Sequence, residues 1–217
     1  MTDKLKKTSE PSANCMLCPR LSKYRSENKE KYPEYFNAPV PSFGDSSAEL
    51  IIVGLAPGLK GANWSGRPFT GDYAGDLLYA TLTKFGFTQG EYGARADDGL
   101  SLNKIRITNA VRCAPPQNKV VAHEINACAP YLDADLKSLS KLKAILALGT
   151  VAHGALLKVL KLRKKDYLFG HNVRHELPNG VILFDSYHCS RYNTNTGRLT
   201  ERMFQDVFRN IQKKLSH

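Results

Sequence analysis

Two pairs of cysteines constrain the fold of this chain more than any other feature of its sequence. Cys15 and Cys18 have the C-x₂-C spacing of metal ligands, and only folding can bring Cys113 and Cys128 to them. Four thiolates complete either a tetrahedral zinc site or a cubane iron–sulfur cluster. Disulfides or unrelated core cysteines are the alternatives, but the chain has five cysteines and its start, MTDKLKKTSE, lacks a secretory h-region. The spacing therefore favours a metal centre that holds an N-terminal arm, residues 1–47, on the body.

Length and charge limit the class of protein and of partner. The 217 residues predict one domain, residues 1–217, with a sizeable core. No apolar run approaches the ~18 residues that span a bilayer, so we expect a soluble protein. The formal net charge of +11 favours a nucleic-acid partner, although solvated helix faces and tails hold part of this charge and membranes attract the same surface.

Buried strands alternate with amphipathic helices along most of the chain. Strands are predicted at residues 49–55, 104–110, 143–149 and 180–185. Helices are predicted at about residues 75–85 and 122–139, from residue 150, and at about residues 199–215. This alternation predicts an α/β fold of three layers, α/β/α, around a central four-stranded parallel sheet.

The loops at the carboxyl ends of these strands are the expected place for a ligand. They are residues 54–58, 109–113, 149–153 and 188–190, and three of them carry usable chemistry. His153, at the start of the helix after the third strand, is interpreted as a structural residue.

A glycine-rich segment from Gly54 to Asp72 is difficult to explain by packing alone. Its glycines let the backbone approach a ligand closely, Phe69 offers a flat face to a planar group, and Asp72 supplies a carboxylate. A phosphate-binding loop is a competing interpretation, but neither a Walker motif nor G-x-G-x-x-G is present. A packed surface loop is the structural alternative.

Five motifs along the chain resemble the uracil-DNA glycosylase superfamily, and within it family 5, the type-b enzymes that contain an iron–sulfur cluster. They are GLAPG at 54–58, GRPFTGD at 66–72, TNAVRCAPP at 108–116, HCS at 188–190 and NTGRLT at 195–200. The resemblance extends from Cys15 to the last helix. It implies a uracil-DNA glycosylase-like fold. Leu55 fits the family's lack of a polar residue at that position, whereas Cys189 replaces the proline of the usual His-Pro-Ser motif.

The resemblance also implies a cofactor and an activity. The cofactor is a [4Fe–4S] cluster bound by Cys15, Cys18, Cys113 and Cys128, while spacing alone leaves zinc open. The activity is hydrolysis of the N-glycosidic bond of uracil, and of other deaminated bases, in DNA during base excision repair. Such an enzyme is monofunctional, because no lysine occupies a motif position.

Roles for individual residues follow from the same resemblance. Asp72 and His188 are the implied catalytic residues: Asp72 positions water or stabilises the cationic sugar, and His188 donates a hydrogen bond to O2 of the base. Phe69 stacks on the flipped base, and Asn109 binds its Watson–Crick edge. The remaining implied substrate-binding residues are Gly54, Ala56, Ser190, Arg191 and Asn195.

Simpler interpretations remain open at this stage. Asp72 is a candidate turn cap, His188 a candidate strand-end histidine bonded to the backbone, and Asn109 a candidate loop cap. The altered motif at Cys189 supports a non-catalytic, metal-stabilised nucleic-acid-binding protein as the alternative function. An enzyme acting on free nucleotides is a third interpretation. The expected protein is a monomer that binds uracil-containing DNA and no membrane, in the cytoplasm, and at the nucleoid in a bacterium.

Overall fold

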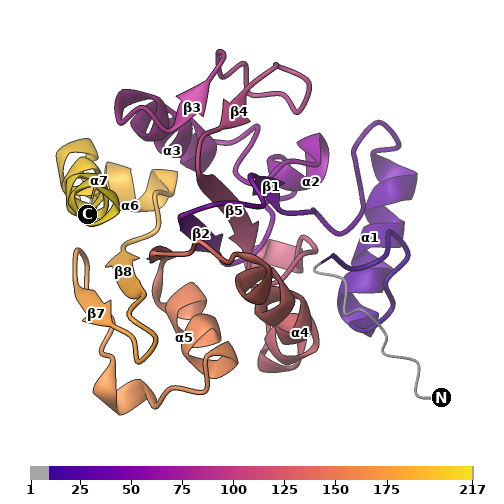
Figure 1. The fold of residues 1–217 in the computed structure, drawn as a ribbon. Helices are drawn as coiled ribbons and strands as arrows, with labels where there is room; N and C mark the ends of the chain where they lie inside the picture. The colour runs from indigo at the N-terminus through magenta and orange to yellow at the C-terminus, as the bar shows by residue number, and fades with distance from the viewer. Residues whose placement is uncertain (1–9, 217) are drawn as a thin grey trace.

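A six-stranded sheet forms the centre of the computed structural model, which describes residues 10–216 (Figure 1). Its strands lie in the order β1-β5-β2-β6-β8-β7, and the four inner strands are parallel. These four confirm the predicted strands: β2 (Leu50–Gly54), β5 (Ile105–Asn109), β6 (Ala144–Leu148) and β8 (Ile182–Ser186). All residues of β2, β6 and β8 are buried, as expected for parallel strands covered on both faces.

The sequence did not predict the two antiparallel strands at the edges of the sheet. β1 (Phe43–Gly44) pairs with β5, and β7 (Arg174–Glu176) pairs with β8. Strands of two or three residues are too short to show an alternating pattern, so sequence periodicity does not reveal them. The sheet is therefore mixed, with the predicted parallel sheet as its centre.

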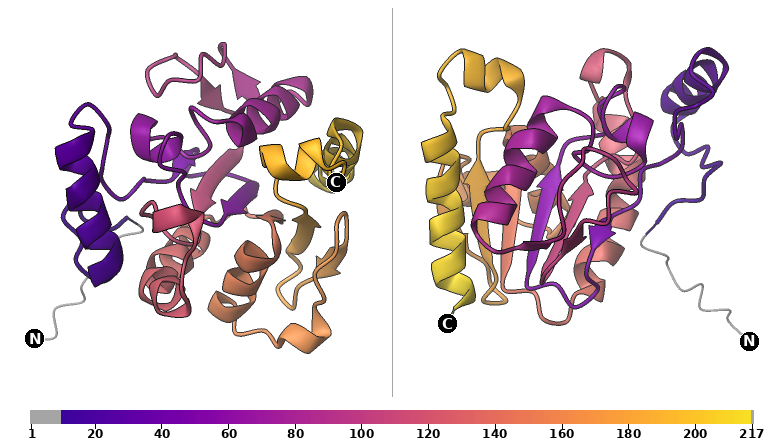
Figure 2. Two further views of the ribbon diagram at one scale, coloured as in Figure 1. Left: turned by 180° about the vertical axis from the view of Figure 1, so that it is seen from behind. Right: turned by 90° about the horizontal axis from the view of Figure 1, so that it is seen from above.

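Helices on both faces of the sheet complete the predicted three layers (Figure 2). One face is covered by α3 (Tyr73–Lys84) and α7 (Glu201–Leu215), the other by α4 (Ala122–Ser138) and α5 (Thr150–Val159). Alternate residues of β2 point to the two cores, Ile52 toward α3 and α7 and Ile51 toward α4 and α5. Burying one such side chain stabilises the fold by about 1.5–3 kcal/mol.

The N-terminal arm contains a helix that the sequence pattern did not indicate. This helix, α1 (Pro19–Lys31), buries only Leu21 among its apolar side chains, so it shows no helical period of apolar residues. It begins directly after Cys18 with a proline in its first turn, a favourable position for proline. Leu21 packs in a small separate core with Val111 and three of the paired cysteines. Residues 1–9 of the predicted arm lie outside the described residues.

Several short elements connect these parts. They are α2 (Ala62–Ser65), the hairpin of β3 (Thr88–Gln89) and β4 (Ser101–Leu102), the 3₁₀ turns η1 (Pro116–Asn118) and η2 (Lys164–Asp166), and α6 (Arg191–Asn195). Within residues 10–216, no helix combines the length and the apolar character needed to cross a bilayer.

Candidate active site

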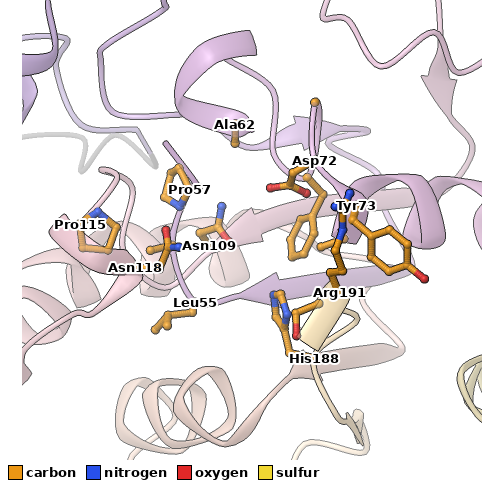
Figure 3. A pocket seen from close by; sticks show the side chains of 16 residues that line it. Leu55, Pro57, Ala62, Asp72, Tyr73, Asn109, Pro115, Asn118, His188 and Arg191 are labelled. Carbon is orange, nitrogen blue, oxygen red and sulfur yellow. The ribbon is translucent and has the colours of Figure 1, made fainter. Parts of the chain in front are cut away.

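A cavity of about 590 Å³ opens at the carboxyl ends of the parallel strands (Figure 3). Its walls come from the loops after β2, β5 and β8 and from the start of α3. This is the edge at which open parallel sheets bind ligands. The site therefore lies where the loops after three predicted strands converge.

Phe69 forms one wall and is held in a fixed position. Its φ of 53° lies in the left-handed region, and the Tyr79 hydroxyl donates a hydrogen bond to the neighbouring Pro68 carbonyl at 2.8 Å. Gly54 and Gly75 permit this placement, because a Cβ on Gly54 would lie 2.6 Å from Phe69 Cζ and one on Gly75 would lie 1.8 Å from Phe69 O. Gly54, predicted as a substrate-binding residue, thus lies behind Phe69 and is not part of the cavity wall.

Arg67, to which the sequence analysis gave no role, anchors the loop that carries Phe69. Its guanidinium makes two 2.7 Å hydrogen bonds to the carboxylate of Asp98, and both side chains are buried. The guanidinium also lies over the rings of Tyr79 and Tyr92, 5.3 and 5.6 Å from their centroids. The hydrogen bonds from Arg67 hold the pKa of Asp98 well below its usual range. A buried, bidentate ion pair of this kind fixes the loop geometrically.

Asp72 has two tasks, one for each carboxylate oxygen. Oδ1 accepts a hydrogen bond from Gly75 N at 3.1 Å, so Asp72 is the N-cap of α3 and the predicted turn cap is present. Oδ2 is directed toward Gly58 and Gly61, where added Cβ atoms would lie 3.1 and 2.2 Å from it. No group among residues 10–216 donates a hydrogen bond to Oδ2. One oxygen therefore remains for a ligand in the cavity.

His188 lies across the cavity from Phe69, with ring centroids 6.0 Å apart and planes inclined at 31°. Burial lowers the pKa of His188, and the nearby carboxylate of Asp72 offsets only part of that effect. The imidazole is therefore neutral near pH 7 and has one N–H to donate. Within the described chain its ring nitrogens make no hydrogen bond, whereas its backbone carbonyl accepts one from Asn193 Nδ2 at 2.8 Å. The loop that carries His188 is therefore fixed by its backbone, and the ring nitrogens remain available to a ligand.

Cys189, at the position where the resembled motif has proline, is closely packed. The residue is fully buried, and its Sγ lies 3.4 Å from the carbonyl oxygen of Ala74 in the first turn of α3. Burial raises the pKa of the thiol, so it stays protonated and unreactive at neutral pH. Cys189 thus acts as a small residue that fills the loop.

Asn109 ends β5 with its side chain directed toward the cavity (Figure 3). The residue is 3% exposed, and its Oδ1 has no hydrogen-bond partner. An unsatisfied buried acceptor costs about 1–3 kcal/mol, which a donor on a bound ligand would recover. The loop-cap alternative does not account for this oxygen.

The other predicted substrate-binding residues are distributed unevenly around the cavity. Ala56, Ser190 and Arg191 lie on its wall. The Arg191 guanidinium lies 5.4 Å from the centroid of the Tyr73 ring. Asn195 is exposed at the end of α6 and does not line the cavity, so its role stays a prediction.

Two lining residues with side chains suited to binding were not predicted from the sequence, Tyr73 and Asn118. Asn118 has a φ of 56° and lies in the loop after β5, close to Pro115 (Figure 3). The rule that ligands bind at strand ends would have included Asn118 if it had been applied beyond Cys113.

The four paired cysteines meet beside α1, outside this cavity. Cys15, Cys18, Cys113 and Cys128 surround a small hollow, and all four are free thiols, which excludes the disulfide alternative here. Burial raises the pKa of Cys18 to about 11 and that of Cys113 to about 12. Arg25 Nη1 donates a hydrogen bond to Cys113 Sγ at 3.4 Å. Buried thiols with pKa values this high become thiolates only when a cation compensates their charge.

Four cysteine thiols around one hollow form a donor set that fits either a zinc ion or an iron–sulfur cluster.

Comparison with known proteins yields one family and several related proteins. The sequence profile described as "Uracil DNA glycosylase superfamily" matches residues 41–212. The chain is 44% identical over 198 residues to the type-5 uracil-DNA glycosylase of Thermus thermophilus, covering 89% of this chain and 90% of that protein. It is 39% identical over 200 residues to the type-5 protein of Pyrobaculum aerophilum, covering 90% and 87%. Identity to the type-4 uracil-DNA glycosylase of Sulfurisphaera tokodaii is 30% over 216 residues, covering 94% and 84%.

Proposed function

Because the chain belongs to the uracil DNA glycosylase superfamily, in its type-5 branch, we propose that this cavity removes uracil from DNA by hydrolysing the N-glycosidic bond. One observation carries the proposal. Four residues that line a single cavity supply an aromatic ring, an amide with an unsatisfied oxygen, a neutral imidazole and a free carboxylate oxygen. These are the groups that the resemblance implied, and together they can bind and release a planar base.

The base binds after it leaves the duplex stack. Extrusion costs a few kcal/mol, least for a mispaired or damaged base, which contributes to selectivity. In the cavity the base stacks on Phe69, and the unsatisfied Asn109 Oδ1 accepts a hydrogen bond from an N–H of the Watson–Crick edge.

Bond cleavage places negative charge on the base and positive charge on the sugar. His188 donates its one N–H to O2 of the base as the charge develops, in a half-buried setting that strengthens the interaction. Asp72 Oδ2 orients the attacking water or stabilises the cationic sugar, while Oδ1 keeps the carboxylate in place on α3. No lysine is among the described residues that line the cavity, so the enzyme cleaves without a Schiff base and is monofunctional.

The cavity wall also supports a range of substrates beyond uracil. An apolar stretch of the wall is formed by Leu55, Ala56 and Pro57. Few polar groups in this stretch can contact a bound base. Pockets with few polar groups reject analogues weakly. Hypoxanthine and xanthine are therefore proposed as further substrates.

A [4Fe–4S] cluster on Cys15, Cys18, Cys113 and Cys128 belongs to the same proposal. The residues fit such a group, because four free and largely buried thiols surround one hollow. When bound, the cluster supplies a cross-link and no step of the reaction. Arg25, which bonds both Cys113 Sγ and Cys15 O, holds the arm in the orientation that the cluster needs.

The domain organisation, oligomeric state and location of the protein belong to the same proposal. The chain forms one domain with residues 1–47 as the metal-clipped arm, and it acts as a monomer on DNA in the cytoplasm, at the nucleoid in a bacterium. Nothing in residues 10–216 favours the non-catalytic binding protein, because the altered motif still presents His188 to the cavity.

The proposal is tested with oligonucleotides that each carry a single uracil, hypoxanthine or xanthine. Purified protein with intact cluster is incubated with each, and alkali then cleaves the strand wherever a base has been lost. We expect cleavage at uracil and at both other lesions. Cleavage at uracil alone would refute the broad range, and cleavage at none would refute the glycosylase function. Iron and acid-labile sulfide measured in the same preparation test the cluster.

A further inference from the structure

Three potential metal ligands gather at the edge of the sheet, away from the four cysteines. They are His153 on α5, His175 on β7 and Asp185 on β8, elements that lie side by side in Figure 1. One ligand atom of each lies within 4.8 Å of the others. None of the three lines the cavity, and the proposed glycosylase function gives none of them a role.

The two contacts of the His153 ring require an additional proton or a metal ion beside Nδ1. Its Nδ1 lies 2.7 Å from Asp185 Oδ1, and its Nε2 lies 2.9 Å from the carbonyl oxygen of Tyr167. Both partners are acceptors, whereas a neutral imidazole carries one N–H. The contact between Nδ1 and Oδ1 therefore holds either an additional proton, on His153 or on Asp185, or a metal ion bound by both residues.

Two further atoms distinguish a proton from a metal ion. His175 Nε2 and Asp185 Oδ2 are buried, have no hydrogen-bond partner, and lie 3.4 Å apart. Asp185 is fully buried, so water does not reach its carboxylate. An additional proton on His153 or on Asp185 Oδ1 would satisfy only the contact between Nδ1 and Oδ1 and would leave His175 Nε2 and Asp185 Oδ2 unsatisfied. A divalent cation between the three side chains would satisfy all of them.

We propose that His153, His175 and Asp185 bind one divalent transition-metal ion, with Zn²⁺ as the best match. The ligand atoms are His153 Nδ1, His175 Nε2 and the Asp185 carboxylate, a donor set that suits zinc with an exogenous fourth ligand. The Nε2–H of His153 then donates to the Tyr167 carbonyl, the outer-shell bond typical of metal-bound histidine.

The surroundings restrict access to this site and limit its affinity. The Phe169 and Tyr167 rings pack edge-on against His153 and His175, with centroids 5.6 Å apart in each pair. The side chain of His175 is 13% exposed, which leaves a route for the ion. Lys164 interacts unfavourably with a positive charge at His153 and so weakens binding without blocking it. The ion joins α5 and β7 to β8, and His188 lies three residues beyond Asp185.

The test uses cluster-loaded protein that has been treated with a chelator and desalted. Zn²⁺ is titrated calorimetrically, and bound zinc is counted after gel filtration while cluster absorbance is monitored. We expect one zinc per chain and a higher Tm with zinc for wild type and for His123→Gln, a control at an exposed histidine. In His175→Gln we expect zinc affinity at least about 10-fold lower and no shift in Tm.

His175→Gln is the informative variant because it changes a partly exposed residue of an edge strand, so the fold should persist. Circular dichroism and cluster absorbance verify that it does. Equal zinc binding by wild type and His175→Gln would overturn the proposal. So would wild-type protein that retains no zinc and shows no change in Tm. Either result is independent of glycosylase activity.

Discussion

At the scale of single residues, the site depends on side chains that serve structure and chemistry at once. Asp72 caps α3 through Oδ1 and presents Oδ2 to the cavity. His188 is held through its backbone carbonyl and remains free at its ring. A single substitution can therefore remove the chemistry of such a residue and leave its structural contact intact.

Asp72→Asn separates the two tasks of that residue. Asparagine also caps helices well, so we expect the free energy of unfolding to change by less than about 1 kcal/mol. The loss of the negative charge should lower the rate of uracil release about 10²–10³-fold. Urea denaturation and single-turnover kinetics measure the two quantities. A rate within a few-fold of wild type would show that the carboxylate acts only as a cap.

The pH dependence of the rate reports on His188. Burial lowers the pKa of this histidine, so it remains neutral as the pH falls through the ordinary histidine value of about 6.5. We expect uracil release to stay constant across that pH and to decline only below it, as the ring becomes protonated. The single-turnover rate measured from pH 8 down to pH 5 would show this decline. A decrease in the rate centred above pH 6.5 would contradict the role of a neutral His188 as the hydrogen-bond donor.

At the scale of elements, the close approach of β2 to the Phe69 loop shapes the cavity. A Cβ on Gly54 would collide with Phe69 and with Asn109 Oδ1, 2.5 Å away. Gly54→Ala should therefore displace the ring, reduce stability by about 1–3 kcal/mol and reduce uracil excision. Gly154→Ala, within α5 and with only Lys164 nearby, should instead stabilise the protein by about 0.5–1 kcal/mol. Equal stability of both variants in urea would contradict the steric argument.

The docking of α1 depends on the cysteine centre and on one ion pair. Arg20 makes bidentate hydrogen bonds of 2.7 and 2.8 Å to Glu124 of α4. Cys18→Ser should eliminate cluster absorbance and lower Tm by several degrees, because the ion pair alone cannot hold a helix with little apolar surface. Cys189→Ser, at the cysteine outside this group, should retain the cluster absorbance. Equal absorbance of the two variants would exclude the proposed ligand set.

At the scale of the whole molecule, the parallel sheet and its covering helices could be predicted from the sequence. Apolar runs mark the strands, and apolar residues at helical spacing mark the helices. The edge strands β1 and β7 and the helix α1 could not be, because they are very short or bury few apolar side chains. The expectation that ligands bind at the carboxyl ends of parallel strands placed Asn109 and His188 at one edge of the sheet, and both line the cavity. Asn118 lies farther along the loop after β5 than that expectation was applied. The group of His153, His175 and Asp185 depends on tertiary geometry that no local pattern contains.

The rate of uracil release by wild type and His188→Ala, under single-turnover conditions on one uracil-containing duplex, addresses the proposed chemistry most directly. We expect release by wild type, a fall of about 10²–10³-fold in the variant, and similar DNA affinity for both, because His188 acts on charge that develops during cleavage. If the two proteins release uracil equally fast, or wild type with intact cluster releases none, His188 does not drive the departure of the base from this cavity.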